Sequence, residues 1–231
     1  MIILMKGRIF LVALVMFFAQ RAYAQYEPTT TWPYLYPDFT SGELQPYKAA
    51  ARQGLFNIHI PHGCLHFIDG DMIREVNSAE VFSVKVGADS FVCAGGRLMK
   101  VMAHDGNVYV LENSEIDMNQ LNATGGAYGS SSSTLATTAL SSIDDFSTGA
   151  ATNHMQLKSN KDNGRILPLM KKKYILLPGR LIYATKKDVL EVGGIETSVV
   201  AAFIKENKIK WKEDQSLLKV GLFLNEKLNA K

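Results

Sequence analysis

The chain contains few cysteines and, after its first 24 residues, no long apolar run. Two cysteines, Cys64 and Cys93, occur in 231 residues. They cannot build a disulfide framework, although an exported compartment would permit one bond between them, and two free thiols are the alternative. No apolar run beyond residue 24 approaches the roughly 20 residues of a membrane-spanning helix. The sequence therefore excludes a disulfide-rich scaffold and a membrane-spanning helix in the mature chain.

Several catalytic motifs are also missing. No serine lies in a Gly-x-Ser-x-Gly elbow, and the Gly125–Gly129 stretch lacks the Lys-Ser or Lys-Thr of a phosphate-binding loop. Cys93 has no histidine close to it in sequence, and Asp69 and Asp71 are more simply turn residues than paired catalytic carboxylates. A hydrolase would therefore have to assemble its site from residues distant in sequence.

Residues 1–24 have the pattern of a cleavable export signal. Lys6 and Arg8 precede the apolar run Ile9–Ala19, and Ala22–Ala24 supplies the small-x-small pattern of a cleavage site. We expect the mature chain to begin at Gln25 and to reach the periplasm, the cell surface or the medium. No cysteine stands at the cleavage site, so the sequence gives no support for a lipid anchor at an N-terminal cysteine.

Charge is balanced in the expected mature chain but divided between its halves. The chain has 25 Lys and Arg against 22 Asp and Glu, and removal of the three basic signal residues leaves 22 of each. Residues 25–150 carry a net charge of −8, and residues 151–231 carry +8. The balanced total argues against a nucleic-acid partner. The opposite signs favour docking of the halves, weakened by salt, over two separate partners.

An arm rich in aromatic residues and proline occupies residues 25–40. It includes Trp32, Tyr34, Tyr36 and Phe39, and its X-Pro steps keep it extended. We favour an arm that lays its rings over a sheet or core, because aromatic side chains dominate burial. The alternative is a stacking platform for sugars or peptides, with Trp32, Tyr34 and Tyr36 as the candidate contacts.

Residues 41–118 alternate short apolar runs with turn signals, a pattern typical of a β-meander. The connections are too short for parallel neighbours, so the strands are predicted to be antiparallel. The predicted fold class is α+β, with a barrel- or sandwich-like meander followed by a hairpin and helices. The expected strands are Phe56–Ile60, Cys64–Ile68, Met72–Val76, Val81–Val86, Phe91–Ala94, Leu98–Ala103 and Val108–Leu111.

One hairpin of this meander carries the candidate metal ligands. A two-residue turn at His62-Gly63 would place His59 directly opposite His66, with Cys64 on the same face. Imidazole and thiolate are ligands for zinc or copper. The set has no recognised spacing and no evident fourth ligand, so a histidine pair on a solvated face is the alternative.

Residues 119–150 differ in composition from both flanks. From Ala123 to Ala150, 21 of 28 residues are Ala, Gly, Ser or Thr. Such a segment buries little apolar surface, which predicts a linker or mobile loop.

Residues 151–231 are predicted to form a small basic unit of a hairpin and helices. Pro178-Gly179 joins two apolar runs, and Thr185 can cap a short helix. A second helix is expected at Thr197–Glu206, and Asp214 can cap a last one. Lys208–Lys212 alternates lysine with apolar residues, which predicts a short strand or an extended connection.

The basic residues of this unit are candidate partner contacts. Lys171, Lys172 and Lys173 form a run, and Lys210 and Trp211 belong to a second cluster. Both clusters could bind an anionic glycan, a lipid headgroup or a nucleic acid, and the alternative is a solvated face complementary to the acidic half. The aromatic residues among them are too few for a nucleic-acid platform.

Four segments carry a resemblance that spans most of the mature chain: Trp32–Thr40, Leu55–Ile60, Gly125–Ser132 and Phe203–Lys212. Together they resemble a group of uncharacterised secreted proteins of Bacteroidetes-type bacteria. The resemblance implies envelope or secreted placement and adds no catalytic residue.

The sequence as a whole predicts an exported, non-enzymatic binding or structural protein of the bacterial cell envelope. We expect no cofactor, and an envelope protein or glycan as partner. One alternative is a small-ligand or metal-binding module that uses the His59 and His66 face. The other is a hydrolase whose site cannot be recognised in the sequence.

Overall fold

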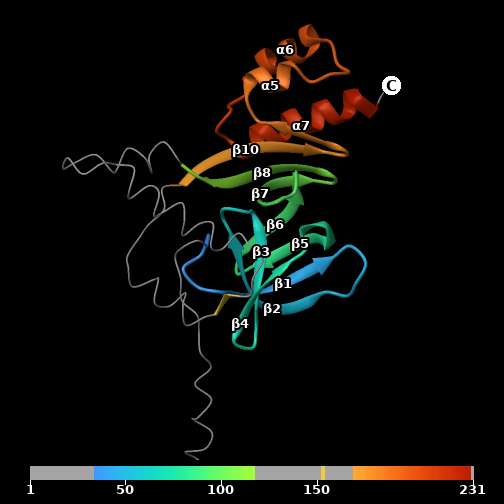
Figure 1. Ribbon diagram of the computed structural model, residues 1–231. Helices are drawn as coiled ribbons and strands as arrows, with labels where there is room; N and C mark the ends of the chain where they lie inside the picture. Colours follow the sequence, from blue (N-terminus) through green and yellow to red (C-terminus); the bar gives the residue numbers. More distant parts are fainter. Residues whose placement is uncertain (1–33, 118–151, 154–168, 230–231) are drawn as a thin grey trace, which may run out of the picture.

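The computed structural model describes residues 34–117, 152–153 and 169–229 (Figure 1). The predicted signal at residues 1–24, Trp32 and the predicted linker at residues 119–150 lie outside the described residues. Within these described residues, eleven strands form one antiparallel sheet in the order β11-β10-β8-β7-β6-β5-β1-β2-β3-β4-β9. The strands are β1 (Thr40–Pro46), β2 (Arg52–His59), β3 (Cys64–Asp69), β4 (Met72–Val76), β5 (Val81–Val86), β6 (Asp89–Ala94), β7 (Arg97–Asp105), β8 (Val108–Ile116), β9 (Thr152–Asn153), β10 (Leu169–Leu177) and β11 (Arg180–Tyr183). The helices are the 3-10 turn η1 (Ser78–Glu80), α5 (Lys186–Leu190), α6 (Thr197–Glu206) and α7 (Asp214–Asn229).

The α+β class and the antiparallel meander are confirmed, and each strand predicted for the meander is present. The sheet curls but does not close, since β11 and β9 form its two ends. β1 was not predicted, because Leu44 is its only fully buried side chain and no apolar run marks it. A Cβ at its Gly42 would lie 2.0 Å from the carbonyl oxygen of Lys85, so the close pairing of β1 with β5 requires glycine there.

The curled half of the sheet encloses a first hydrophobic core. It gathers side chains from β1, β2, β3, β5, β6 and β7, all on the concave face. Their burial follows from strand alternation, which turns every second residue of each strand inward. The buried members are Leu44, Phe56, Ile58, Leu65, Val81, Val84, Val86, Phe91 and Leu98.

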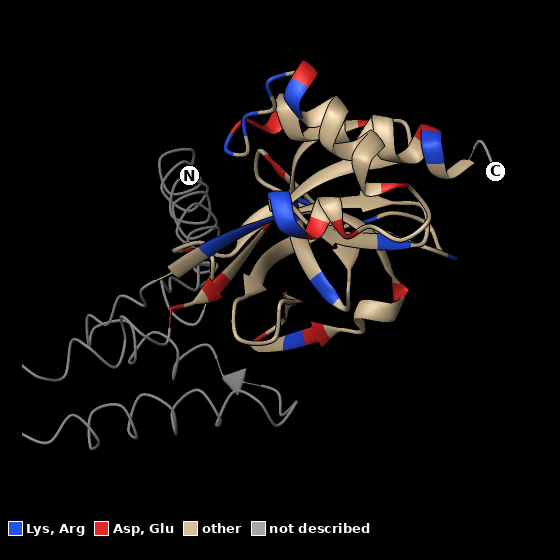
Figure 2. Ribbon diagram, turned by 90° about the horizontal axis from the view of Figure 1, so that it is seen from above, with Lys and Arg blue, Asp and Glu red and all other residues tan. Residues whose placement is uncertain are grey.

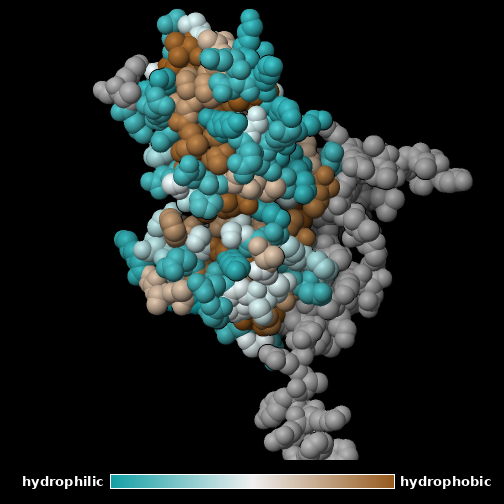
Figure 3. Space-filling model, turned by 180° about the vertical axis from the view of Figure 1, so that it is seen from behind, coloured by the Kyte–Doolittle hydropathy of each residue, from teal (hydrophilic) through white to brown (hydrophobic). Residues whose placement is uncertain are grey.

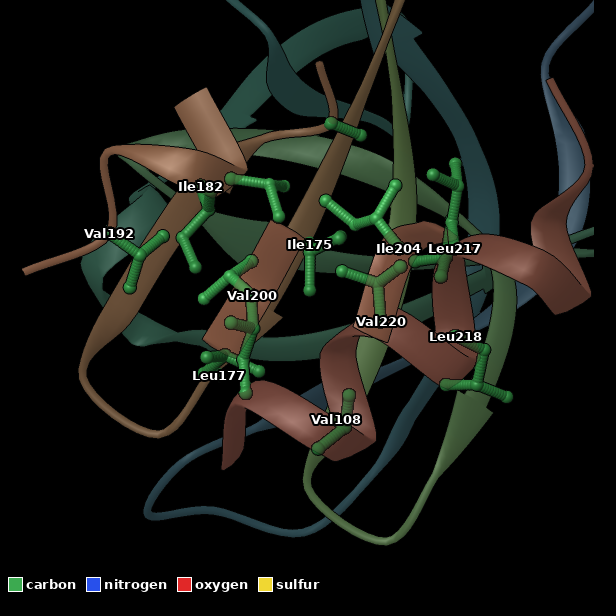
Figure 4. Close-up of a cluster of buried hydrophobic side chains, with 14 of the residues drawn as sticks. Val108, Ile175, Leu177, Ile182, Val192, Val200, Ile204, Leu217, Leu218 and Val220 are labelled. Atoms are coloured by element: carbon green, nitrogen blue, oxygen red, sulfur yellow. The ribbon is translucent and has the colours of Figure 1, made fainter. Parts of the chain in front are cut away.

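A second core lies under the C-terminal helices, which cover β8, β10 and β11 at one end of the molecule (Figures 1 and 4). Thr185 caps α5 by accepting a hydrogen bond from the Asp188 backbone N–H, and α6 has the predicted bounds. The apolar stripe of α7, including Leu217 and Leu224, faces Ile175 of β10. At about 1.5–3 kcal/mol for each buried aliphatic side chain, this packing holds helices that would be marginal alone.

The Lys208–Lys212 segment is not a strand. It forms two turns between α6 and α7, with Lys208 at a φ of 48°, in the left-handed region. Trp211 packs partly buried against the second core, and Lys210 pairs with Glu213 at 2.8 Å. The alternating pattern was misleading because its apolar members pack beneath a turn rather than on one face of a strand.

The acidic and basic halves meet in the sheet, because β10 pairs with β8. Lys171 Nζ lies 2.9 Å from Glu112 Oε1, and Lys172 Nζ lies 2.6 Å from Glu115 Oε2. Lys173 pairs instead with Asp214 of α7 at 2.5 Å. Lys and Arg residues are interspersed with Asp and Glu residues along the ribbon (Figure 2). Within the described ranges, no helix is both long and apolar enough to cross a bilayer.

Candidate metal centre

The β2–β3 hairpin brings the predicted metal ligands together, in a register that differs from the expected one. His59 pairs with Cys64, and His66 pairs with Asn57, so the connection has four residues instead of two. The slip of two residues keeps every side chain on its predicted face. His59, Cys64 and His66 therefore share one face as predicted, although His59 does not stand directly opposite His66.

Contacts from β7 explain the longer connection. The Arg97 guanidinium donates hydrogen bonds to the carbonyl oxygens of Ile60 and Pro61, at 2.8 and 3.2 Å. The Leu98 backbone N–H donates to the carbonyl of Gly63 at 2.7 Å. These contacts join residues more than 30 positions apart, so local turn rules could not anticipate them.

Five side chains that can ligate metal converge on this face of β2, β3 and β4. The ligand atoms of His59, His62 and Cys64 all lie within 4.8 Å of one another, and so do those of Cys64, His66 and Glu75. Cys64 belongs to both groups, and its Sγ lies 4.0 Å from His59 Nδ1. The rings of His59 and His66 stack with centroids 4.7 Å apart and planes 6° apart. We call these five residues the His/Cys/Glu cluster.

His59, Cys64 and His66 are buried, which rules out the alternative of a histidine pair on a solvated face, whereas His62 is half-buried and Glu75 is exposed. His59 is 0% exposed and His66 is 6% exposed. Tyr34 of the aromatic arm covers them, with edge-on ring contacts to both histidines and its hydroxyl 2.9 Å from His66 Nδ1. The arm thus lays a ring over the sheet, as favoured from the sequence, and Tyr34 is not free to act as a stacking platform.

Asn57 fixes the arm in this position. Its side-chain amide donates to the carbonyl oxygens of Tyr36 and Asp38, at 2.9 and 3.0 Å, and its Oδ1 accepts from the Tyr36 backbone N–H at 3.1 Å. Asn57 is itself fully buried. A buried amide with this many partners holds the arm in one place, because breaking any of these bonds would leave a polar group unsatisfied.

Two members of the cluster, His62 and Glu75, were not among the predicted ligands. Glu75 stands opposite His66 across the β3–β4 pair, with its Oε2 3.4 Å from His66 Nε2. The two-residue turn at Gly70-Asp71 fixes that register, so hairpin rules applied there would have found Glu75. His62 lies in the β2–β3 connection with its ring centroid 4.9 Å from that of His59.

Burial sets the protonation of the metal-free cluster. It lowers the pKa of His59 to about 2, helped by the neighbouring His66 and His62. Burial also lowers the pKa of His66, although the neighbouring Glu75 acts to raise it. Burial, and then Glu75, raises the pKa of the Cys64 thiol. Both buried imidazoles are neutral, the form that binds metal, and a metal ion would displace the thiol proton.

The possible Cys64–Cys93 disulfide is not formed, and both thiols are free. Cys64 is buried in the cluster, whereas Cys93 lies half-buried on β6 beside the first core. Of the candidate partner contacts, Tyr36 directs its hydroxyl to Asp89 at 2.6 Å, away from the cluster. Comparison of the chain with protein-family models, curated proteins and solved structures finds no match.

Proposed function

We propose that the chain is an exported, non-enzymatic protein of the bacterial envelope that binds a zinc-class metal ion at the His/Cys/Glu cluster. The observation that carries the proposal is the convergence of ligand atoms from His59, His62 and Cys64 within 4.8 Å. The sequence pattern of residues 1–24 and the resemblance to secreted proteins support the exported location.

The donor set favours zinc or a metal of similar softness. One thiolate and two imidazoles are typical zinc ligands, with bonds of about 2.3 Å to sulfur and 2.0 Å to nitrogen. Tetrahedral ligands at those lengths stand about 3.5 Å apart, so the side chains need to close by only about 1 Å. We assign the first group, His59, His62 and Cys64, as the ligands, because it supplies one thiolate and two imidazoles, whereas the second group has a single imidazole.

His66 and Glu75, the two members of the cluster that are not assigned as ligands, would then surround and orient the site. His66 stacks on His59, and the contacts of His66 with Tyr34 and Glu75 hold that ring in place. Such supporting partners contribute to metal affinity because they fix the orientation of the ligands.

Zinc titration of the chelator-treated full chain tests the proposal. We expect about one equivalent of tightly bound zinc in a competition assay with a chromogenic chelator. Cys64→Ser and His62→Ala should each lose it. Cys93→Ser and His104→Gln, which change the other cysteine and a histidine outside the cluster, should keep it.

Circular dichroism of each variant separates lost binding from lost folding. His62→Ala is the decisive change, because His62 lies in a connection and is not fully buried. Zinc binding that persists in folded His62→Ala and Cys64→Ser, or that is absent from the wild-type chain, would refute the proposal.

A further inference from the structure

A partly open cavity of about 200 Å³ lies beside the first core and is lined by Ile58, whose side chain is on the face of β2 opposite that of His59. Its floor is apolar and includes Leu35, Ile58, Phe91 and Leu98. Drug-sized sites run from about 300 to 1,000 Å³, so this volume limits an occupant to a smaller molecule. Ile58, Phe91 and Leu98 are buried members of the first core, so the half-buried Leu35 is the floor side chain with apolar surface left for such a molecule to cover.

Two acidic and two basic side chains also line the cavity: Asp89, Lys100, Glu112 and Lys171. Lys100 Nζ lies 2.7 Å from Asp89 Oδ1, and Lys171 Nζ lies 2.9 Å from Glu112 Oε1. Lys100 also stands directly opposite Glu112 in the β7–β8 register, so the two ion pairs are neighbours on one face.

This quartet separates the two hydrophobic cores of the concave face. Phe91 of the first core pairs with Lys100, and Lys100 pairs with Glu112, in one continuous row across β6, β7 and β8. Glu112 has a side chain only 11% exposed, whereas the Lys171 side chain is 62% exposed. The ammonium of Lys171 is therefore the charge that an incoming molecule meets first.

The net charge of these four side chains determines which charge a bound molecule can carry. Their four charges sum to zero, so a ligand with one net charge would leave one of them uncompensated in a partly desolvated site. A zwitterion keeps the balance, because its carboxylate can approach the lysines while its ammonium approaches the carboxylates. An apolar side chain would then rest on the floor.

We propose that this cavity binds a free α-amino acid with an apolar side chain. The proposal is independent of the metal site, which lies on the other face of β2 and uses none of these residues. Tyr36 adds a further polar group at the rim, since its hydroxyl donates to Asp89 Oδ2 at 2.6 Å.

Calorimetric titration of the full chain with L-leucine tests the proposal. N-acetyl-leucine lacks the ammonium, leucine amide lacks the carboxylate, and glycine lacks the apolar side chain. We expect leucine to bind and each of the three to bind about tenfold more weakly, as the loss of one charged or apolar contact implies. Equal binding of leucine and N-acetyl-leucine, or no leucine binding at about 10 mM, would overturn the proposal.

Lys171→Gln supplies the matching variant, because its exposed side chain can be changed without disturbing a core. It should weaken leucine binding by about fivefold or more. Lys173→Gln is the control, since Lys173 is on the same strand but pairs with Asp214 and does not line the cavity. Equal leucine affinity in both variants would contradict the assignment. Cys64→Ser should bind leucine normally, so failure of the metal proposal would remain distinguishable.

Discussion

His59 shows how the surroundings of one residue determine its chemistry. The side chain is fully buried between Tyr34 and His66, in a place where an imidazolium would lose its hydration. Burial is the main reason that its pKa is lowered to about 2, against about 6.5 in an unfolded chain. The fold thus keeps neutral a residue that would be partly charged in an unfolded chain near neutral pH.

We therefore predict that acid destabilises the metal-free protein. Because the folded pKa of His59 lies below the unfolded one, its contribution is complete above about pH 6.5. That contribution is lost as the pH falls toward 2, by up to about 1.4 kcal/mol per pH unit. Urea unfolding in chelator should show the decline, and NMR should show no titration of the His59 ring between about pH 8 and 4. A ring that titrates near pH 6.5 would contradict the prediction.

Tyr34→Phe tests the contribution of the arm. It removes the hydroxyl 2.9 Å from His66 Nδ1 and leaves a buried polar atom without that partner. We expect the free energy of unfolding to fall by about 1–3 kcal/mol. If the cluster binds zinc, the affinity should also fall by about 10- to 100-fold, the range seen when a supporting partner of a ligand is lost.

Tyr47→Phe is the matched control for that change, because the Tyr47 side chain is 59% exposed. It should alter the free energy of unfolding by no more than about 0.5 kcal/mol. Equal losses in both variants would show that the hydroxyl of Tyr34 has no special contribution.

Helix α7 shows how an element depends on one close contact. A Cβ at Gly221 would lie 2.7 Å from Val108 Cγ1 and 3.0 Å from Ile175 Cγ2, both on buried and rigid side chains. Glycine within a helix costs about 1 kcal/mol relative to alanine. Glycine at position 221 therefore lowers the helix propensity of α7 but allows the helix to lie directly on β8 and β10.

We predict that Gly221→Ala destabilises the protein although alanine is the better helix former. Overpacking a core costs about 1–3 kcal/mol, and subtracting the gain of about 1 kcal/mol in helix propensity leaves a net loss of up to about 2 kcal/mol. Thermal unfolding of Gly221→Ala and the wild-type chain measures this loss of stability. Lys219→Ala, at an exposed position of the same helix, should change stability by less than about 0.5 kcal/mol. An increase in stability on Gly221→Ala would contradict the prediction and show that β8 and β10 move easily to make room for the added methyl group.

Elements defined by local patterns were predictable, and those defined by distant contacts were not. The α6 bounds and the Thr185 cap follow from periodicity and capping, which act within a few residues. β1 and the four-residue connection after His59 depend on β5 and β7, which no local rule contains. The shared face of His59, Cys64 and His66 was predictable because a slip of two residues preserves alternation. The burial of this face under Tyr34 was not predictable, because the arm crosses the sheet from outside the hairpin.

At the scale of the whole molecule, charge and apolar contact both join the two halves. The opposite net charges of residues 25–150 and 151–231 predicted docking that salt would loosen. In the structure, ion pairs such as Lys171–Glu112 accompany the pairing of β8 with β10. Val108 and Val110 of the first half are buried together with Ile175 and Leu217 of the second. Backbone pairing and a shared core do not depend on screened surface charge.

The structure therefore revises that expectation. After cleavage at a protease site inserted between residues 123 and 150, the two fragments should elute together at about 50 mM and at about 1 M NaCl. At the higher concentration the screening length falls to about 3 Å and exposed ion pairs contribute little. Burial of the apolar surface between Val108, Ile175 and the α7 stripe is not weakened by this screening. The double variant Lys171→Gln and Lys172→Gln should also stay associated. Fragments that separate only at high salt would show that the charges hold the halves together.

Because the second core takes residues from both halves, we expect each fragment alone to expose that face and to aggregate.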